Sequence, residues 1–309
     1  MPVQRECKSS AHPVIISKDC NSMSTPKEIL HQYDIKPRKK LGQSFLVDTN
    51  VIKKIAAAAN ISSDDIVVEI GAGIGVLTEN IAHIAKQVIA VEIDSQLVQT
   101  LHKQLIGHQN IEIYAGDIIE FDFSLIFNKY KAKVKVIGNV PYSISSPVIF
   151  HLLSFRSIIN SFTLMLQKEV VHRLVSMPNN KSYGVPSVLL QMYAEVERLF
   201  DVSATCFYPR PKVESSIIHG IFREKSLVPI DDEILFGRLV KAAFAHRRKT
   251  LINNLKNAKF LEGLTPTTLK EKLEAAGIDG QRRGETLSLM EFGHLSNVLK
   301  EIDEKAVKY

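Results

Sequence analysis

The stretch "DIVVEIGAGIGVLTENIAHIAKQVIAVEID", residues 65–94, decides the fold. Its first part, 65–73, is an apolar run typical of a buried strand, and it leads into a turn rich in glycine. Residues 76–86 then carry apolar side chains at helical spacing, and 87–94 form a second apolar run. Strand, turn, helix and strand in this order are typical of the unit that builds a parallel sheet.

The same alternation continues along the chain. Further helices are expected at 95–105, near 145–154, at 168–175 and at 185–196, and further strands at 110–117, at 133–139, near 162–167 and at 212–223. We therefore predict an α/β fold, with a parallel sheet covered by helices on both faces. From about 231 to 308 the periodicity is helical throughout, which predicts a smaller all-helical region at the C-terminal end.

These patterns divide the chain into three predicted regions. Residues 1–30 are expected to form a disordered extension, because the first 22 residues are polar and lack the apolar core of a signal peptide. A start assigned too early, with Met23 as the true start, is the alternative. Residues 31–225 form the predicted Rossmann-like α/β domain, and residues 229–309 the helical domain.

Composition limits the partners. No apolar run of the 309-residue chain approaches the ~18 residues of a membrane helix. The net charge of +6 favours a polyanionic partner such as nucleic acid. Three scattered cysteines, Cys7, Cys20 and Cys206, favour free thiols in a reducing compartment over a disulfide framework or a zinc site. We therefore expect a cytoplasmic protein with no bound metal and no membrane contact.

Glycines follow the first strand of the deciding stretch. Gly71, Gly73 and Gly75 let the backbone turn sharply and approach a ligand beside a helix N-terminus. A dinucleotide-binding loop has the spacing G-x-G-x-x-G, but Val76 stands where its third glycine belongs. The G-x-G-x-G spacing instead resembles the S-adenosylmethionine loop of class I methyltransferases. The resemblance implies S-adenosyl-L-methionine as the cofactor, with an NAD-dependent dehydrogenase as the alternative.

Acidic residues end the next two strands. Glu92 lies 21 residues after Gly71, where a carboxylate can accept hydrogen bonds from ribose hydroxyls. Asp94 is an alternative for that role. Asp117 ends the third strand, where it can receive the adenine amino group of the cofactor. The glycine loop and the two acids, in this order, favour a methyltransferase over a dehydrogenase.

The fourth strand ends in "GNVPYS", residues 138–143. Asn and Pro are ordinary turn residues, so a simple strand-ending turn is one interpretation. A chemical interpretation is that carbonyl oxygens of Asn139 and of Pro141 (or Val140) accept hydrogens from an exocyclic base amine. The nitrogen lone pair would then point at the methyl donor, while Tyr142 stacks on a flipped base. The position beside the cofactor loop favours this catalytic interpretation.

"NVPY" resembles the Asn-Pro-Pro-Tyr signature of amino-methyltransferases, in the Asn-aliphatic-Pro-Tyr form of RNA adenine dimethyltransferases. Further family blocks follow in order over residues 30–293: "KKLGQSFLVD", "MLQKEVVHRL", "CFYPRPKVESS" and "FAHRRKTLINNL". The chain therefore resembles the ribosomal RNA adenine dimethyltransferases. The last block and the helical tail favour members that act on the small ribosomal subunit. This implies dimethylation at N6 of two adjacent adenines near the 3′ end of that RNA and a role in subunit assembly.

The resemblance also implies the site residues. Those at the cofactor are Ser44, Leu46, Gly71, Gly73, Glu92, Asp117 and Asn139. Ser44 departs from the usual Asn or His, and its contact is left open between side chain and backbone. The catalytic residues are Asn139, Pro141, Tyr142 and Phe207. Phe207 matches the aromatic residue that sandwiches the target base opposite Tyr142, with an ordinary core aromatic as the alternative.

Basic runs are candidate phosphate contacts, although a charge run is often only a solvated face. The candidates are Lys36, Arg38, Lys39, Lys40, Arg210, Lys212, Arg247, Arg248 and Lys249. We expect a monomer whose partner is the RNA of a pre-ribosomal small subunit. One alternative is the related antibiotic-resistance methylase, which modifies one adenine of large-subunit RNA. The other is a non-catalytic RNA-binding factor with this fold.

Overall fold

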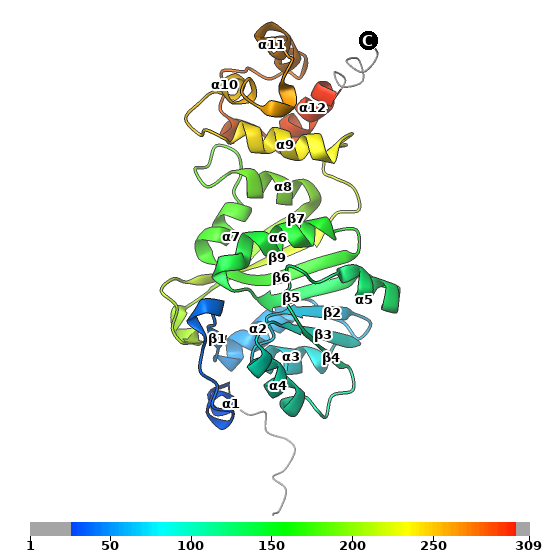
Figure 1. Cartoon of the computed structure of the whole chain (residues 1–309), viewed down its shortest axis with the longest axis vertical. Coiled ribbons are helices and arrows are strands. Elements are labelled where there is room, and N and C mark those ends of the chain that lie inside the picture. The colour runs from blue at the N-terminus through cyan, green and yellow to red at the C-terminus, as the bar shows by residue number, and fades with distance from the viewer. Residues whose placement is uncertain (1–25, 301–309) are drawn as a thin grey trace, which may run out of the picture.

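The structure, a computed structural model, describes residues 26–300 of the chain. Its centre is a seven-stranded sheet with the strand order β4-β3-β2-β5-β6-β9-β7 (Figure 1). The strands are β2 (Ile66–Ile70), β3 (Gln87–Glu92), β4 (Ile111–Ala115), β5 (Val134–Asn139), β6 (Ile159–Gln167), β7 (Ala194–Val202) and β9 (Ser215–Phe222). The predicted α/β fold is confirmed.

Helices cover both faces of the sheet because the apolar side chains of its inner strands alternate. On β2, Ile66, Val68 and Ile70 pack in the cluster that contains α5 (Phe123–Tyr130), α6 (Ser145–Ser154) and α8 (Val185–Tyr193). Val67 points the other way, into the cluster that contains residues of α2 (Thr49–Ala58) and α3 (Val76–Ala82). The remaining helices of this region are α4 (Ser95–Gln104) and α7 (Lys168–Leu174).

Two features of the sheet differ from the prediction. The sheet is not wholly parallel, because β9 returns between β6 and β7 and runs antiparallel to both. The helix predicted over 185–196 ends at Tyr193, and the chain continues directly into β7. Charged residues on this edge strand interrupt its apolar alternation, and such charges are common on edges because they discourage pairing with other chains.

The N-terminal extension was expected to reach residue 30, and this is wrong for residues 26–30. Helix α1 (Pro26–Gln32) packs Ile29 and Leu30 against Ile52 and Leu97, which gives these apolar side chains a buried place. Residues 1–25 of the predicted extension lie outside the described residues. A short antiparallel pair, β1 (Phe45–Leu46) with β8 (Phe207–Tyr208), links the segment after α1 to the chain before β9.

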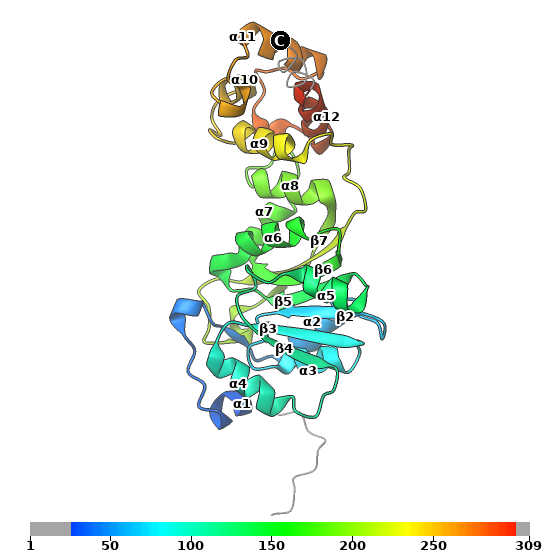
Figure 2. The ribbon, with the colours of Figure 1, turned by 45° about the vertical axis from the view of Figure 1, so that its right-hand side comes forward.

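The C-terminal helices are α9 (Glu233–Ala243), α10 (Leu251–Leu255), α11 (Pro266–Ala275) and α12 (Leu289–Lys300). They lie beyond α8, at the end of the molecule opposite α1, and Figure 2 shows α8 between the sheet and α9. Phe236 and Leu239 of α9 share one apolar cluster with Leu190 and Met192 of α8. The division into two domains therefore stays a prediction, since one core runs through both. No helix within residues 26–300 is long and apolar enough to cross a membrane.

Candidate active site

A cavity of about 270 Å³ opens at the carboxyl ends of the parallel strands, where open α/β sheets bind ligands. Its walls include eight of the predicted catalytic and cofactor residues: Ser44, Gly71, Gly73, Glu92, Asp117, Asn139, Pro141 and Tyr142. Leu46 lines a smaller adjoining cavity of about 50 Å³, which shares Gly71, Gly73 and Asn139 with the first. The cavity thus brings the predicted cofactor loop and the "NVPY" loop together.

Glycines make this approach possible. Gly71 has φ +67°, and a Cβ there would lie 3.3 Å from the carbonyl oxygen of Asn139. A Cβ at Gly138 would lie 2.5 Å from the carbonyl oxygen of Ile70, well inside van der Waals contact. The ends of β2 and β5 can therefore meet closely only because neither residue carries a side chain.

Glu92 is buried at the end of β3, and its carboxylate is fixed by two backbone amides. One oxygen accepts from Gly73 N at 2.9 Å and the other from Asp94 N at 2.9 Å. Burial raises the pKa of Glu92 above its usual value, while the hydrogen bonds from the two backbone amides act in the opposite direction. The carboxylate is therefore aimed at the glycine loop, as the predicted ribose contact requires.

Asp94, the alternative ribose acceptor, is occupied elsewhere. Its carboxylate caps α4 through Gln96 N at 3.0 Å, accepts from Gln43 Nε2 at 2.8 Å and pairs with Arg38 at 3.0 Å. These contacts tie the segment before β1 to the sheet. Asp94 thus ties structural elements together and does not line this cavity, which leaves Glu92 as the candidate for the ribose contact.

Asp117 keeps the predicted position after β4. One of its carboxylate oxygens accepts from Ile119 N at 2.9 Å, and the residue lines the cavity. The hydrogen bond from Ile119 N holds the Asp117 side chain at the cavity wall, where its carboxylate could accept a hydrogen bond from the amino group of an adenine.

Glu69 lines the smaller cavity and was not predicted as a site residue from the sequence. It is fully buried on β2 and has one oxygen, Oε2, without a hydrogen-bond partner among residues 26–300. Burial raises the pKa of Glu69 to about 8; the neighbouring Thr78 hydroxyl acts in the opposite direction, although it makes no well-formed hydrogen bond, and the nearby Glu92 raises the pKa further. An ammonium group would supply both the missing partner and a compensating charge. One acidic residue in the apolar run "IVVEI" was the available signal.

The side chains of the "NVPY" loop have definite partners. Asn139 Nδ2 donates to the carbonyl oxygen of Ser44 at 3.0 Å, so Oδ1 is the amide atom that remains to accept a hydrogen. Pro141 O accepts from Ile144 N at 3.1 Å within the following turn. The Tyr142 hydroxyl bonds with Ser215 Oγ at 2.8 Å. Val140 is completely buried, which explains an aliphatic residue at that position.

Ser44 turns its hydroxyl away from the cofactor loop. Ser44 Oγ donates to Pro209 O at 2.8 Å, and its own carbonyl oxygen receives the Asn139 amide. The structure therefore assigns both polar groups of Ser44 to protein partners. Any contact of this residue with the cofactor is left to its remaining backbone atoms.

Phe207 does not line the cavity. It is 5% exposed and packs in an apolar cluster with Ile55 and Val202, whereas its neighbour Tyr208 is 51% exposed. Successive residues of a strand point to opposite faces, so in β8 one aromatic ring faces the core and the other faces solvent. The structure thus places Phe207 as a core aromatic, and its predicted place opposite Tyr142 stays a prediction.

The predicted phosphate contacts are exposed, but several have protein partners. Arg38 pairs with the buried Asp94, and Lys36 pairs with Asp34 at the surface. The exposed candidates that have no carboxylate partner among residues 26–300 are Lys39, Lys40, Arg210, Lys212, Arg248 and Lys249. Of these, Lys40 lines the cavity that holds Glu92 and Asn139.

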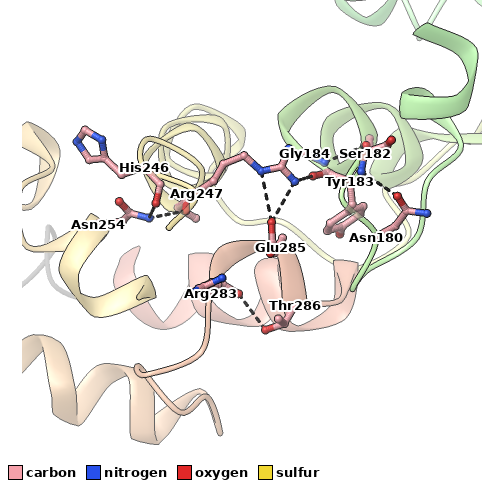
Figure 3. Close-up of polar contacts among 12 residues, drawn as sticks. Asn180, Ser182, Tyr183, Gly184, His246, Arg247, Asn254, Arg283, Glu285 and Thr286 are labelled. Carbon is pink, nitrogen blue, oxygen red and sulfur yellow. Dashed lines mark hydrogen bonds and ion pairs between the residues drawn. The ribbon is translucent and has the colours of Figure 1, made fainter. Parts of the chain in front are cut away.

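Arg247 joins the C-terminal helices to the loop before α8 (Figure 3). Its guanidinium pairs with Glu285 at 3.0 Å and donates to Tyr183 O at 3.3 Å. Asn179 N also donates to Glu285 O at 2.8 Å, so Glu285 contacts both Arg247 and the loop before α8. Arg247 is half exposed and its charge is paired with Glu285, and its predicted contact with RNA phosphate stays a prediction.

A second cavity, of about 720 Å³, lies beside Arg247 between α7, the loop before α8 and the segment after α9. Its walls carry Lys168, His172, Arg173, Lys181 and Arg247, together with the acidic Glu169 and Glu214. The segments that form it are far apart in sequence, so no local motif indicated it. Within residues 26–300, no group of three or more His, Cys, Asp or Glu side chains is placed to hold a metal ion.

Comparisons with known proteins identify the family. The family model described as "Ribosomal RNA adenine dimethylase" matches residues 35–294. The "Ribosomal RNA small subunit methyltransferase A" of Syntrophus aciditrophicus (strain SB) is 44% identical over 278 residues, which cover 90% of this chain and 99% of that protein. The protein of the same name from Listeria welshimeri is 41% identical and covers 94% and 100% of the two chains.

Two solved structures are similar in fold and sequence. A dimethyladenosine transferase from Plasmodium falciparum matches with a TM-score of 0.73 and 30% identity, over 84% of this chain and 97% of that one. The 23S rRNA methyltransferase ErmE matches with a TM-score of 0.63 and 25% identity, over 83% and 99%. The predicted class I methyltransferase fold and the family resemblance are confirmed, and the chain belongs to the ribosomal RNA adenine dimethylase family.

Proposed function

We propose that this protein transfers methyl groups from S-adenosylmethionine to N6 of two adjacent adenines near the 3′ end of small-subunit ribosomal RNA. The product is N6,N6-dimethyladenine. The observation that carries the proposal is that Asn139, Pro141 and Tyr142 share one cavity wall with Gly71, Glu92 and Asp117. An amine-activating loop beside a nucleoside-binding loop is what methylation of a base nitrogen requires.

The residues of the two adjoining cavities fit S-adenosylmethionine, which supplies a methyl group on a positively charged sulfur. The buried carboxylate of Glu92 suits ribose hydroxyls, and Asp117 suits the adenine amino group. The unpartnered oxygen of Glu69 suits the ammonium end. The glycine loop, with no side chains at Gly71 and Gly73, lets the backbone approach all three groups closely.

Asn139 and a backbone carbonyl would activate the target amine. The lone pair of an exocyclic amine is delocalised into the base, so the nitrogen is a poor nucleophile. Asn139 Oδ1 accepts one amino hydrogen, and Pro141 O or Val140 O accepts the other, which holds the nitrogen towards tetrahedral geometry. As the nitrogen–methyl bond forms, the methyl–sulfur bond would break and leave a neutral thioether, so the positive charge would pass to the nitrogen, which would then release a proton to water. Tyr142 holds the flipped base by stacking.

The small subunit is the proposed substrate because the similar proteins from Syntrophus and Listeria are named for it. The likeness to a 23S methyltransferase makes the large subunit the second candidate. Incubating the protein with labelled S-adenosylmethionine and unmethylated small or large subunits, followed by nucleoside mass spectrometry, separates the two. We expect N6,N6-dimethyladenosine in small-subunit RNA, and label confined to large subunits would contradict the proposal.

A non-catalytic RNA-binding factor would lack affinity for the cofactor, so titration calorimetry with S-adenosylmethionine tests that alternative directly. We propose that RNA phosphates contact the exposed Arg210, Lys212, Arg248 and Lys249, and that the helical region 229–309 contacts the pre-ribosomal particle. A monomer acting in the cytoplasm completes the proposal.

A further inference from the structure

The two polar side chains of the catalytic loop are both held, directly or through one residue, by the segment 207–215. At one end of this segment, Ser215 Oγ bonds with the Tyr142 hydroxyl at 2.8 Å. At the other end, Pro209 O accepts from Ser44 Oγ at 2.8 Å, and Ser44 O accepts from Asn139 Nδ2 at 3.0 Å. We call residues 207–215 the bracing segment.

The Ser215 end of the bracing segment is rigid. Ser215 is completely buried and is the first residue of β9. It pairs with Gln167 of β6 on one side and with Val202 of β7 on the other, so its backbone is held between two strands. A hydroxyl in that position is a fixed point for the Tyr142 ring.

The other end of the bracing segment is anchored by pairing and burial. Phe207 pairs with Leu46 in the short β1–β8 ladder, and its ring lies in the core. Ser44, one residue before β1, therefore has a fixed carbonyl partner in Pro209. Through this bond the carbonyl of Ser44 is placed to receive Asn139 Nδ2, which turns Oδ1 to the free side of the amide.

We propose that Ser215 and Ser44 are positioning residues that fix the orientation of Tyr142 and Asn139 for methyl transfer. This rests on the proposed function. Correct orientation of Tyr142 and Asn139 matters more in the second transfer to each nitrogen. Only one amino hydrogen then remains to be bound, and the first methyl group must be accommodated beside it. Loss of either hydroxyl should therefore slow the second transfer more than the first and let N6-monomethyladenosine accumulate.

The Ser215 arm is tested with Ser215→Ala, Tyr142→Phe and the double variant. Each deletes the same hydrogen bond, so we expect each to slow single-turnover methylation by about 3- to 10-fold, and the double variant to be no slower than the worse single one. Ser216→Ala is the matched control. Ser216 is the next residue of β9 and equally buried, but its hydroxyl bonds to Asp201 instead. Tyr142→Phe keeps the test valid if Ser215→Ala folds poorly.

The Ser44 arm is tested with Ser44→Ala. We expect a similar loss of rate and a similar rise in the monomethyl fraction, with the calorimetric affinity for S-adenosylmethionine unchanged. The increase in activation free energy caused by Ser44→Ala should add to that caused by Ser215→Ala, because the two hydroxyls hold different side chains.

Two results would overturn the proposal while leaving the proposed function intact. One is a double variant whose loss of rate is the product of the losses in Ser215→Ala and Tyr142→Phe. The other is a monomethyl fraction in Ser215→Ala and Ser44→Ala that is no higher than in Ser216→Ala. Wild-type protein that makes no dimethyladenosine would overturn both.

Discussion

Glu69→Gln changes the pH dependence of stability in a direction that the structure dictates. Glu69 is buried on β2, and its pKa is raised from 4.5 to about 8. Between these two pH values the folded state holds a proton that the unfolded state releases. The contribution of the group is therefore fully present below pH 4.5 and is lost as the pH rises through about 8.

The size of the effect follows from the same interval. One proton taken up on folding gives a slope of up to about 1.4 kcal/mol per pH unit, and the interval from 4.5 to about 8 gives at most about 5 kcal/mol. Gln cannot ionise, so the variant lacks this slope. Subtracting the two stability curves cancels the other titrating groups that are common to both proteins.

The assay is urea unfolding of both proteins at several pH values from about 5 to about 9, without cofactor. We expect the stability of Glu69→Gln, relative to wild type, to rise up to about pH 8 and to level off above it, where the folded and the unfolded wild type have both released the proton. Parallel curves for the two proteins would refute the assignment of Glu69 as a buried, protonated acid. S-adenosylmethionine should stabilise the wild type more than Glu69→Gln at about pH 8, because its ammonium group meets a charge only in the wild type.

Further variants test the other assignments. Arg247→Ala should lower the free energy of unfolding by about 1–2 kcal/mol, for a half-exposed ion pair and one backbone hydrogen bond, and leave the salt dependence of RNA binding unchanged. Arg248→Ala should leave the free energy of unfolding unchanged and reduce the slope of log K for RNA against log salt by roughly 0.7–0.9. Equal slopes for Arg247→Ala and Arg248→Ala would contradict these two assignments. Glu92→Ala should weaken calorimetric cofactor affinity by about 1.5–3 kcal/mol for each hydrogen bond lost, with RNA affinity nearly intact. Gly138→Ala should lower thermal stability sharply, since its Cβ would lie 2.5 Å from Ile70 O, and an unchanged melting temperature would show that the two strands can separate.

The cofactor side of the site was predictable because its signals are local. Gly71, Glu92 and Asp117 each follow an apolar run, and parallel strands bring their carboxyl ends to one edge of the sheet. Asn139 follows the same rule at the end of β5. Residues far apart in sequence therefore meet without any need to predict their contacts one by one.

What sequence reasoning missed depends on contacts between distant side chains. Nothing near Arg247 indicates that its charge is paired with Glu285, and nothing near Ser44 indicates a hydroxyl bond to Pro209. In β8, a two-residue strand, the choice of which ring faces the core is set by pairing with β1 and not by any pattern of its own. Such pairings have no periodic signature in the chain.

The role of Asn139 is tested most directly by single-turnover methylation with Asn139→Ala on saturating, unmethylated small subunits. Its amide is held by Ser44 with Oδ1 as the remaining acceptor, so the variant loses one oriented partner of the amine. Loss of such a partner is worth about 2.7–4 kcal/mol, or roughly 10²–10³ in rate. We predict that loss of rate, with subunit binding close to wild type. A rate within a few-fold of wild type would contradict the role of Asn139 and leave "NVPY" as a turn that ends a strand.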